Sequence, residues 1–130
     1  MRYKELDIWK RSYQVANQVY SAMKTCRDFG FKDQICRSAV SVPSNIAEGS
    51  ERGSSKDNIR FLYYAKGSCA ELSTQLLLAG DFGYLPQQYA FTLEQEVADI
   101  SRMIAGYINY LLRNNIQDAA AEYRLGNEDD

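Results

Sequence analysis

The sequence contains no histidine. Because histidine is the base in Ser-His-Asp and Cys-His systems and a frequent zinc ligand, its absence excludes those kinds of site. It also excludes the Glu-x-x-His di-iron motif of many four-helix bundles. A phosphate-binding P-loop is missing as well, since Gly49 and Gly53 are not followed by Lys-Ser/Thr. The sequence therefore predicts a protein that is not an enzyme and that holds no metal or cofactor.

Long apolar runs, cysteine and proline are also scarce. No stretch approaches the ~18 consecutive apolar residues of a membrane span, and residues 1–10 lack the apolar segment of a signal peptide. We therefore expect a cytoplasmic protein. The three cysteines, Cys26, Cys36 and Cys69, are odd in number and lie on helical patterns, which predicts buried free thiols. Only two prolines and eight glycines interrupt the 130 residues, so long helices are expected.

Apolar residues recur at helical spacing along most of the chain. Hydrophobic residues make up 45% of the sequence, which is enough for a core. Their spacing of three and four predicts helices over about 6–26, 33–51, 55–79 and 86–113, with Ser54 or Ser55 as the cap of the third. The short connections make successive helices antiparallel, so residues 1–117 are predicted to form an all-α, antiparallel up-down-up-down four-helix bundle. The polar, acidic residues 118–130 are predicted to be a frayed or disordered tail.

The apolar stripe of the first predicted helix is wider than a single neighbour requires, which predicts burial on two sides. Tyrosines at such seam positions favour core or subunit contacts over stacking with nucleic-acid bases. Asp28-Phe29-Gly30 is predicted to end this helix, with Gly30 in the left-handed conformation. The seam consists of Leu6, Trp9, Tyr13, Ala16, Tyr20 and Met23, and the residues that widen it are Val15, Val19, Ala22 and Cys26.

Pro43 lies inside the second predicted helix. Because proline removes one backbone donor and its ring clashes with the carbonyl four residues earlier, we expect a kink near residues 39–42. The alternative is two short helices that are split at Pro43.

The second predicted helix also carries a polar stripe of mostly short hydrogen-bonding side chains. A solvated face would usually carry Lys and Glu, so this composition predicts close packing against the third helix. There Arg37 is expected to pair with Glu48 or Glu71, and Gly67 to let another backbone approach. The alternative is a binding site for a partner or ligand. The stripe comprises Gln34, Arg37, Ser41, Asn45, Glu48 and Gly49, facing Gly67, Ser68 and Glu71 on the third helix.

Charge is unevenly distributed although the net charge is only −2. Lys and Arg are in excess before residue 67, and Asp and Glu after it. One interpretation is a basic face that binds nucleic acid. The other is a set of ordinary solvated helix faces, or complementary surfaces that meet within the bundle or between subunits. The candidate nucleic-acid contacts are Lys10, Arg11, Lys24, Arg52, Lys56, Arg60 and Lys66.

The run from Gln34 to Gly49, with Q-I-x-R-x-A-x-S-V-x-x-N-I-A-E-G, resembles the signature of the four-helix-bundle family of 23S rRNA intervening-sequence proteins. Further matches lie at residues 6–9, 61–72 and 83–85, so the resemblance covers about 3–113. It implies a homo-oligomer, typically a ring of five subunits, with no agreed catalytic residues. A related branch, the accessory proteins of diversity-generating retroelements, binds nucleic acid and a reverse transcriptase. Those relatives are strongly basic, whereas this chain has a sequence pI of about 5.2.

Three hypotheses for the function follow. The leading one is a non-enzymatic, homo-oligomeric helical scaffold that associates with RNA or DNA. The alternative is a protein-interaction module that makes no nucleic-acid contact. The third is a small-molecule binder that uses the polar stripe, although no small-molecule substrate and no membrane partner are expected.

Overall fold

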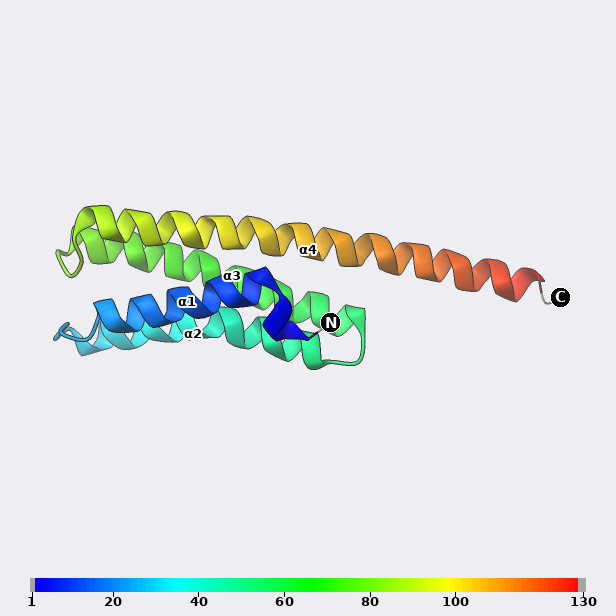
Figure 1. Cartoon of the computed structure of the whole chain (residues 1–130), viewed down its shortest axis with the longest axis horizontal. Coiled ribbons are helices and arrows are strands. Elements are labelled where there is room, and N and C mark those ends of the chain that lie inside the picture. The colour runs from blue at the N-terminus through cyan, green and yellow to red at the C-terminus, as the bar shows by residue number, and fades with distance from the viewer. Residues whose placement is uncertain (1, 129–130) are drawn as a thin grey trace.

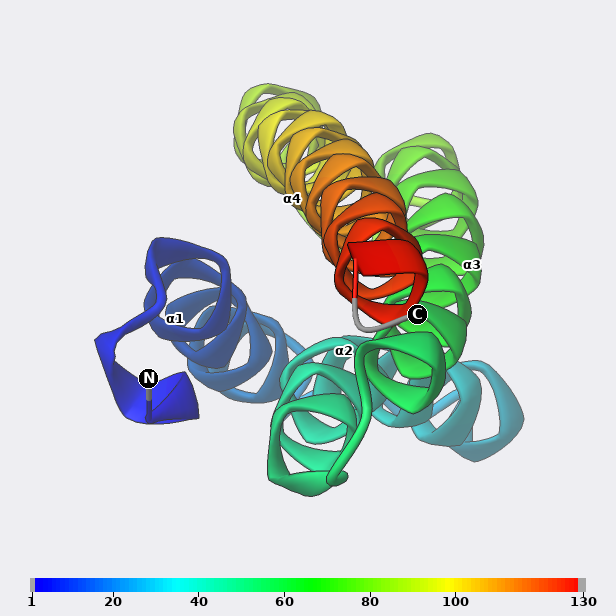
Figure 2. The ribbon, with the colours of Figure 1, turned by 90° about the vertical axis from the view of Figure 1, so that its right-hand side faces the viewer.

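The protein is a bundle of four helices in the computed structural model, which describes the backbone of residues 2–128 and the side chains of residues 2–115. No strand occurs in residues 2–128. Successive helices run in opposite directions (Figure 1), and the end-on view shows them arranged around one core (Figure 2), which confirms the predicted all-α bundle. The helices are α1 (Asp7–Ala22), α2 (Phe29–Glu51), α3 (Ser55–Asp81) and α4 (Gln87–Glu128), preceded by the short 3-10 helix η1 (Tyr3–Glu5).

The core between the helices is aliphatic. Every helix contributes side chains that are almost inaccessible to solvent, and each large one stabilises the fold by about 1.5–3 kcal/mol through burial. Among the residues that the structure describes, no helix is both long and apolar enough to cross a membrane. The largest fully buried side chains include Val15, Val19, Met23, Ile35, Ile46, Leu62, Leu72, Leu76, Ile100 and Ile104.

The face that α1 turns to the core agrees only in part with the predicted seam, of which Met23, directly after α1, is fully buried. Val15 and Val19 are buried, whereas Tyr13 and Tyr20 are 51% and 59% exposed. Trp9 packs only partly against the core. Because α1 has apolar residues on two faces, helical periodicity alone could not tell which face lies inside.

The boundary between α1 and α2 also differs from the prediction. The Asp28 carboxylate accepts a hydrogen bond from the backbone N–H of Phe31 at 3.2 Å, so Asp28 caps the start of α2 instead of closing α1. Gly30 therefore lies inside α2, and the predicted left-handed conformation is wrong. Within the described residues, a positive φ occurs only at Gly83, where the turn from α3 to α4 requires it.

Other features of the helix ends follow the sequence more closely. The Ser54 hydroxyl accepts a hydrogen bond from the N–H of Asp57 at 3.2 Å, so of the two serines predicted as the cap of α3 it is Ser54 that caps the helix. Helix α2 is a single helix that includes Pro43, so the alternative of two short helices is wrong. The kink expected near residues 39–42 stays a prediction.

Helix α4 is longer than its apolar pattern predicts. It continues to Glu128 instead of ending near Arg113, and its C-terminal part projects past the other helices (Figure 1). The side chains of residues 116–130 lie outside the described part of the chain. The predicted frayed tail over 118–130 therefore stays a prediction.

Candidate functional site

The polar stripe of α2 packs against α3 in a hydrogen-bonded layer. The hydroxyls of Ser41 and Ser68 lie 2.7 Å apart, and the Asn45 amide donates to the Ser41 carbonyl and hydroxyl oxygens, each at 2.9 Å. The buried Ser38 hydroxyl donates to the Gln34 carbonyl at 3.1 Å and lies 3.5 Å from a Glu71 carboxylate oxygen. These contacts agree with the predicted packing role of the stripe.

The ion pairs predicted within this layer are wrong. Arg37 is 80% exposed and pairs with Asp33, one turn earlier on α2, with 3.0 Å between Nε and Oδ2. Glu48 pairs with Arg52, also one turn away, at 2.7 Å. Residues four apart on one helix are already neighbours, so these ion pairs form within α2 and need no partner on α3.

Two glycines of the family-like signature have different surroundings. A Cβ atom at Gly49 would lie 2.8 Å from Asn58 Oδ1 and 2.9 Å from Phe61 Cβ, so Gly49 permits a close approach of α2 and α3. A Cβ atom at Gly67 would meet nothing within 4 Å. The prediction that Gly67 lets another backbone approach is therefore wrong within this chain.

A polar pocket of about 420 Å³ lies between α2 and α3. Its walls offer hydroxyl, amide, guanidinium and carboxylate groups. The Oε1 atom of Gln75 is buried and has no hydrogen-bond partner within the described residues. Gln75 follows Glu71 by four residues on α3, so both side chains line the same pocket. The lining residues are Gln34, Arg37, Ser38, Ser41, Ser68, Glu71 and Gln75.

A second pocket is an apolar groove of about 520 Å³ on the outer side of α1 and α2. The rings of Tyr3 and Trp9 meet edge to face, with centroids 5.5 Å apart, and Trp9 and Tyr13 are 4.9 Å apart. The sequence analysis did not predict that α2 lines this groove. The spacing of Val40, Pro43 and Ala47 by three and four residues could have indicated it. We call this the α1–α2 groove; it is lined by Tyr3, Trp9, Tyr13, Ala16, Asn17, Tyr20, Val40, Pro43, Ser44 and Ala47.

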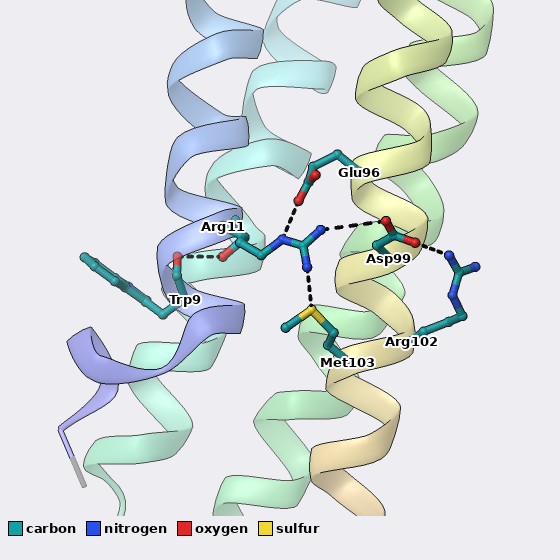
Figure 3. A network of polar contacts seen from close by, with 7 residues as sticks. Trp9, Arg11, Glu96, Asp99, Arg102 and Met103 are labelled. Atoms are coloured by element: carbon teal, nitrogen blue, oxygen red, sulfur yellow. Dashed lines mark hydrogen bonds and ion pairs between the residues drawn. The ribbon is translucent and has the colours of Figure 1, made fainter.

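Arg11 was predicted to contact nucleic acid, but it forms a link between α1 and α4 (Figure 3). Its Nε atom lies 2.5 Å from the Glu96 carboxylate, and NH2 lies 3.7 Å from Asp99. A further guanidinium nitrogen lies 2.9 Å from the Met103 sulfur. The hydrogen bond to Glu96 is the largest factor that raises the pKa of Arg11. The Arg11 charge is thus already compensated within the chain.

The remaining basic candidates do not form one continuous face. Lys10 is exposed on α1, which lies across the bundle from α3 in Figure 2, and Lys24 is exposed in the turn after α1. A second group lies at the turn from α2 to α3, where the guanidinium carbons of Arg52 and Arg60 are 4.9 and 5.0 Å from the centre of the Phe61 ring. Lys56 is exposed on the same first turns of α3, and Lys66 follows, partly buried.

The three cysteines are free thiols, but the prediction that they are buried is right only for Cys69, since Cys26 and Cys36 are half-buried. Cys69 is buried, and desolvation raises its pKa to about 12, while burial also raises the pKa of the partly buried Cys36. A neutral thiol is a poor nucleophile and metal ligand. In the described part of the chain, no group of three or more Cys, Asp or Glu side chains is placed to hold a metal ion.

With this geometry in view, the comparisons with known proteins identify the family. The model of the 23S rRNA-intervening sequence protein family matches residues 4–106. The chain belongs to this family. The matched region includes the α2 polar stripe and its partners on α3, as well as both walls of the α1–α2 groove apart from Tyr3.

A solved structure supports the fold. The chain is similar to the crystal structure of a protein of unknown function from the S23 ribosomal protein family of Bacteroides thetaiotaomicron VPI-5482, with 22% identity and a TM-score of 0.73. The match covers 78% of this chain and 97% of the other. No curated relative matches this chain.

Proposed function

We propose that this family member is a non-enzymatic helical scaffold that assembles with copies of itself through the α1–α2 groove. One observation supports this proposal above all. The groove leaves Tyr13, Tyr20 and Val40 between 51% and 59% exposed, side by side on two helices, beside a core that is already complete. Contiguous apolar surface of this kind marks an interaction site.

Burial of these side chains supplies a driving force for assembly. A large apolar side chain contributes about 1.5–3 kcal/mol when it is fully buried, and the groove residues have about half of that still to gain. The free energy gained when several such residues are buried offsets part of the entropy lost on association. Family resemblance leads us to expect a ring of five subunits.

Light scattering at micromolar concentration tests this function. We expect an oligomeric mass for the unaltered chain and a large shift toward monomer for Tyr20→Glu with Val40→Glu, since two charges in the groove oppose its burial. The matched control is Leu77→Glu with Phe91→Glu, because these residues on α3 and α4 are 48% and 52% exposed outside the groove. A monomeric mass for the unaltered chain would contradict the proposal.

A second candidate function is binding of RNA or DNA at the turn from α2 to α3. Arg52 and Arg60 stack on Phe61, and the exposed Lys56 adds a third cation. Tyr63 and Tyr64 are about half exposed nearby on α3 and offer faces on which bases can stack. Both arginines also pair with carboxylates of their own chain, which reduces their attraction for phosphate. Repetition of this surface in an oligomer would add avidity.

Binding of a structured RNA, followed by fluorescence anisotropy over a salt series, tests this candidate. We expect the affinity to fall as salt rises, and to fall further in Lys56→Glu with Arg60→Glu. Arg102→Glu with Arg113→Glu on α4 changes the net charge equally and should bind as the unaltered chain does. Absence of binding at low salt would reject this candidate and leave the protein-interaction scaffold.

A further inference from the structure

We propose that the polar pocket between α2 and α3 binds a small zwitterion, namely a free α-amino acid. We call this site the α2–α3 pocket. It shares no lining residue with the α1–α2 groove, so the inference goes beyond the proposed self-assembly and does not depend on it. Three features of the pocket lead to it: a wholly polar lining, two opposite charges that do not pair with each other, and polar atoms that the chain leaves unsatisfied.

The first feature is the lining. Every side chain that lines the α2–α3 pocket is polar or charged. The two walls run side by side: the hydroxyls of Ser41 and Ser68 lie 2.7 Å apart. About one turn further along, the Ser38 hydroxyl lies 3.5 Å from the Glu71 carboxylate. Residues 34–41 of α2 span about 10 Å at a rise of about 1.5 Å per residue, so the pocket can hold a small polar molecule but is too short for a helix of a partner.

The second feature is a pair of opposite charges that do not meet. The Arg37 Nε atom lies 3.0 Å from Asp33, which is not part of the lining. Among the residues that the structure describes, Glu71 forms no ion pair. The terminal guanidinium nitrogens of Arg37 can therefore still donate to a carboxylate, and the Glu71 carboxylate can still accept from an ammonium group. A ligand that carries both groups would match both side chains.

The third feature is a set of unsatisfied polar atoms. The Oε1 atom of Gln75 is buried and has no hydrogen-bond partner within the described residues. Its amide can turn about the terminal side-chain torsion, which is broad, and so present its oxygen to an ammonium group. The hydroxyls of Ser41 and Ser68 share a single hydrogen bond, so one of their two protons remains available for a ligand. Buried polar groups without a partner are uncommon and mark a place for water or a ligand.

A zwitterion fits this pocket better than a simple ion. A cation beside Glu71 would be repelled by the Arg37 guanidinium, and an anion beside Arg37 would be repelled by Glu71 and Asp33. A molecule without net charge can place each of its two charged groups beside the opposite charge of the pocket. Free α-amino acids are small molecules of this kind. Their side chains would extend along the remaining hydroxyl and amide groups, which would discriminate among them.

Thermal unfolding of the full chain at a fixed protein concentration tests this inference, with each common L-amino acid at about 10 mM as the probe. We expect at least one of them to raise the midpoint temperature by a few degrees, since a ligand that binds only the folded chain stabilises it. Calorimetric titration then measures the Kd of that amino acid. Its N-acetyl and C-terminal amide derivatives each lack one charge and should bind about tenfold more weakly or worse.

Variants of the two charged side chains locate the binding site. Arg37 and Glu71 are exposed, so Arg37→Gln and Glu71→Gln should fold normally, as circular dichroism can check. Each should weaken binding by about tenfold or more, because each removes a charged hydrogen-bond partner of the ligand. The matched controls are Arg102→Gln and Glu51→Gln. Arg102 also pairs with a carboxylate of its own helix, and neither control residue lines the pocket, so both should keep the unaltered affinity.

Three results would overturn the inference. They are the absence of a rise with any amino acid, binding that Arg37→Gln and Glu71→Gln leave unchanged, and equal binding of the amide derivative, which would indicate a site for a cation alone. These measurements do not use the mass of the assembly. The amino-acid site and the proposed self-assembly can therefore fail independently of each other.

Discussion

At the scale of single residues, Gly49 determines how closely α2 approaches α3. In Gly49→Ala the new Cβ would lie 2.9 Å from Phe61 Cβ and 3.0 Å from the Asn58 backbone oxygen, and neither atom can move without shifting α3. We expect the free energy of unfolding to fall by about 1–3 kcal/mol, as is typical of overpacking. Urea denaturation measures the change.

Gly67→Ala is the matched control, because its Cβ would meet nothing within 4 Å and Gly67 lies in the interior of α3. Alanine has the higher helix propensity, so this variant should be more stable by about 0.5–1 kcal/mol. Equal destabilisation by the two substitutions would show that the close approach at Gly49 has no energetic consequence.

Arg11 is a second residue whose role the structure changed, from candidate RNA contact to a link between α1 and α4. Its side chain and that of Glu96 are each about one-third exposed. A double-mutant cycle of Arg11→Met and Glu96→Gln should give a coupling energy of about 0.5–1 kcal/mol, the range of partly exposed ion pairs. The control is a cycle of Arg102→Met and Glu96→Gln. These two side chains form no ion pair with each other, so their coupling energy should be near zero.

At the scale of elements, Asp28 joins two turns at one end of the bundle. Besides capping α2, its carboxylate accepts a hydrogen bond from the Tyr84 hydroxyl at 2.6 Å, which connects the α1–α2 and α3–α4 turns. This bond, followed by the bond from the Phe31 N–H, lowers the pKa of Asp28. The same bond raises the pKa of the Tyr84 hydroxyl.

These pKa shifts predict how stability depends on pH. Because the pKa of Asp28 is lower in the folded state, its contribution is complete above the unfolded value of about 3.9 and is lost as pH falls through the folded value. As pH falls from about 4 to about 2, the free energy of unfolding should therefore decrease less for Tyr84→Phe than for the unaltered chain. Thermal unfolding over this range measures the difference, and Tyr89→Phe, on the exposed side of α4, is the control.

The packing of elements could be predicted only in part. Ser54 and Ser55 were the two candidates for the cap of α3, because serine shortly before an acidic residue is a local signal of a helix start. The α1–α2 boundary was missed, because Asp28 and Gly30 suit the end of one helix as well as the start of another. For Arg37, the predicted partners were Glu48 and Glu71, and only side-chain geometry showed that the partner is Asp33 on the same helix.

At the scale of the whole molecule, self-assembly should make thermal stability depend on concentration. Only the folded chain assembles, so assembly stabilises the folded state. The midpoint temperature of unfolding therefore rises as the protein concentration rises. We expect this rise for the unaltered chain and for Leu77→Glu with Phe91→Glu. Tyr20→Glu with Val40→Glu should remove it, as scanning calorimetry over a hundredfold range of concentration can show.

The sequence by itself determined the class of fold and the family. Apolar residues at spacings of three and four and short connections are local properties, so an antiparallel four-helix bundle could be derived from them. The run from Gln34 to Gly49 carried the family, which the match over residues 4–106 confirmed. The absence of histidine likewise limits the available chemistry, because it is a property of composition alone.

Only the tertiary structure decided which of two apolar faces of α1 lies inside. Both faces have helical spacing, and the choice depends on how Val15, Val19 and Met23 fit against the other three helices. That choice leaves Tyr13 and Tyr20 outside beside Val40 and so creates the α1–α2 groove. It also brings Arg11 to Glu96, which is 85 residues away in the sequence. A contact over this separation cannot be predicted from a local sequence pattern.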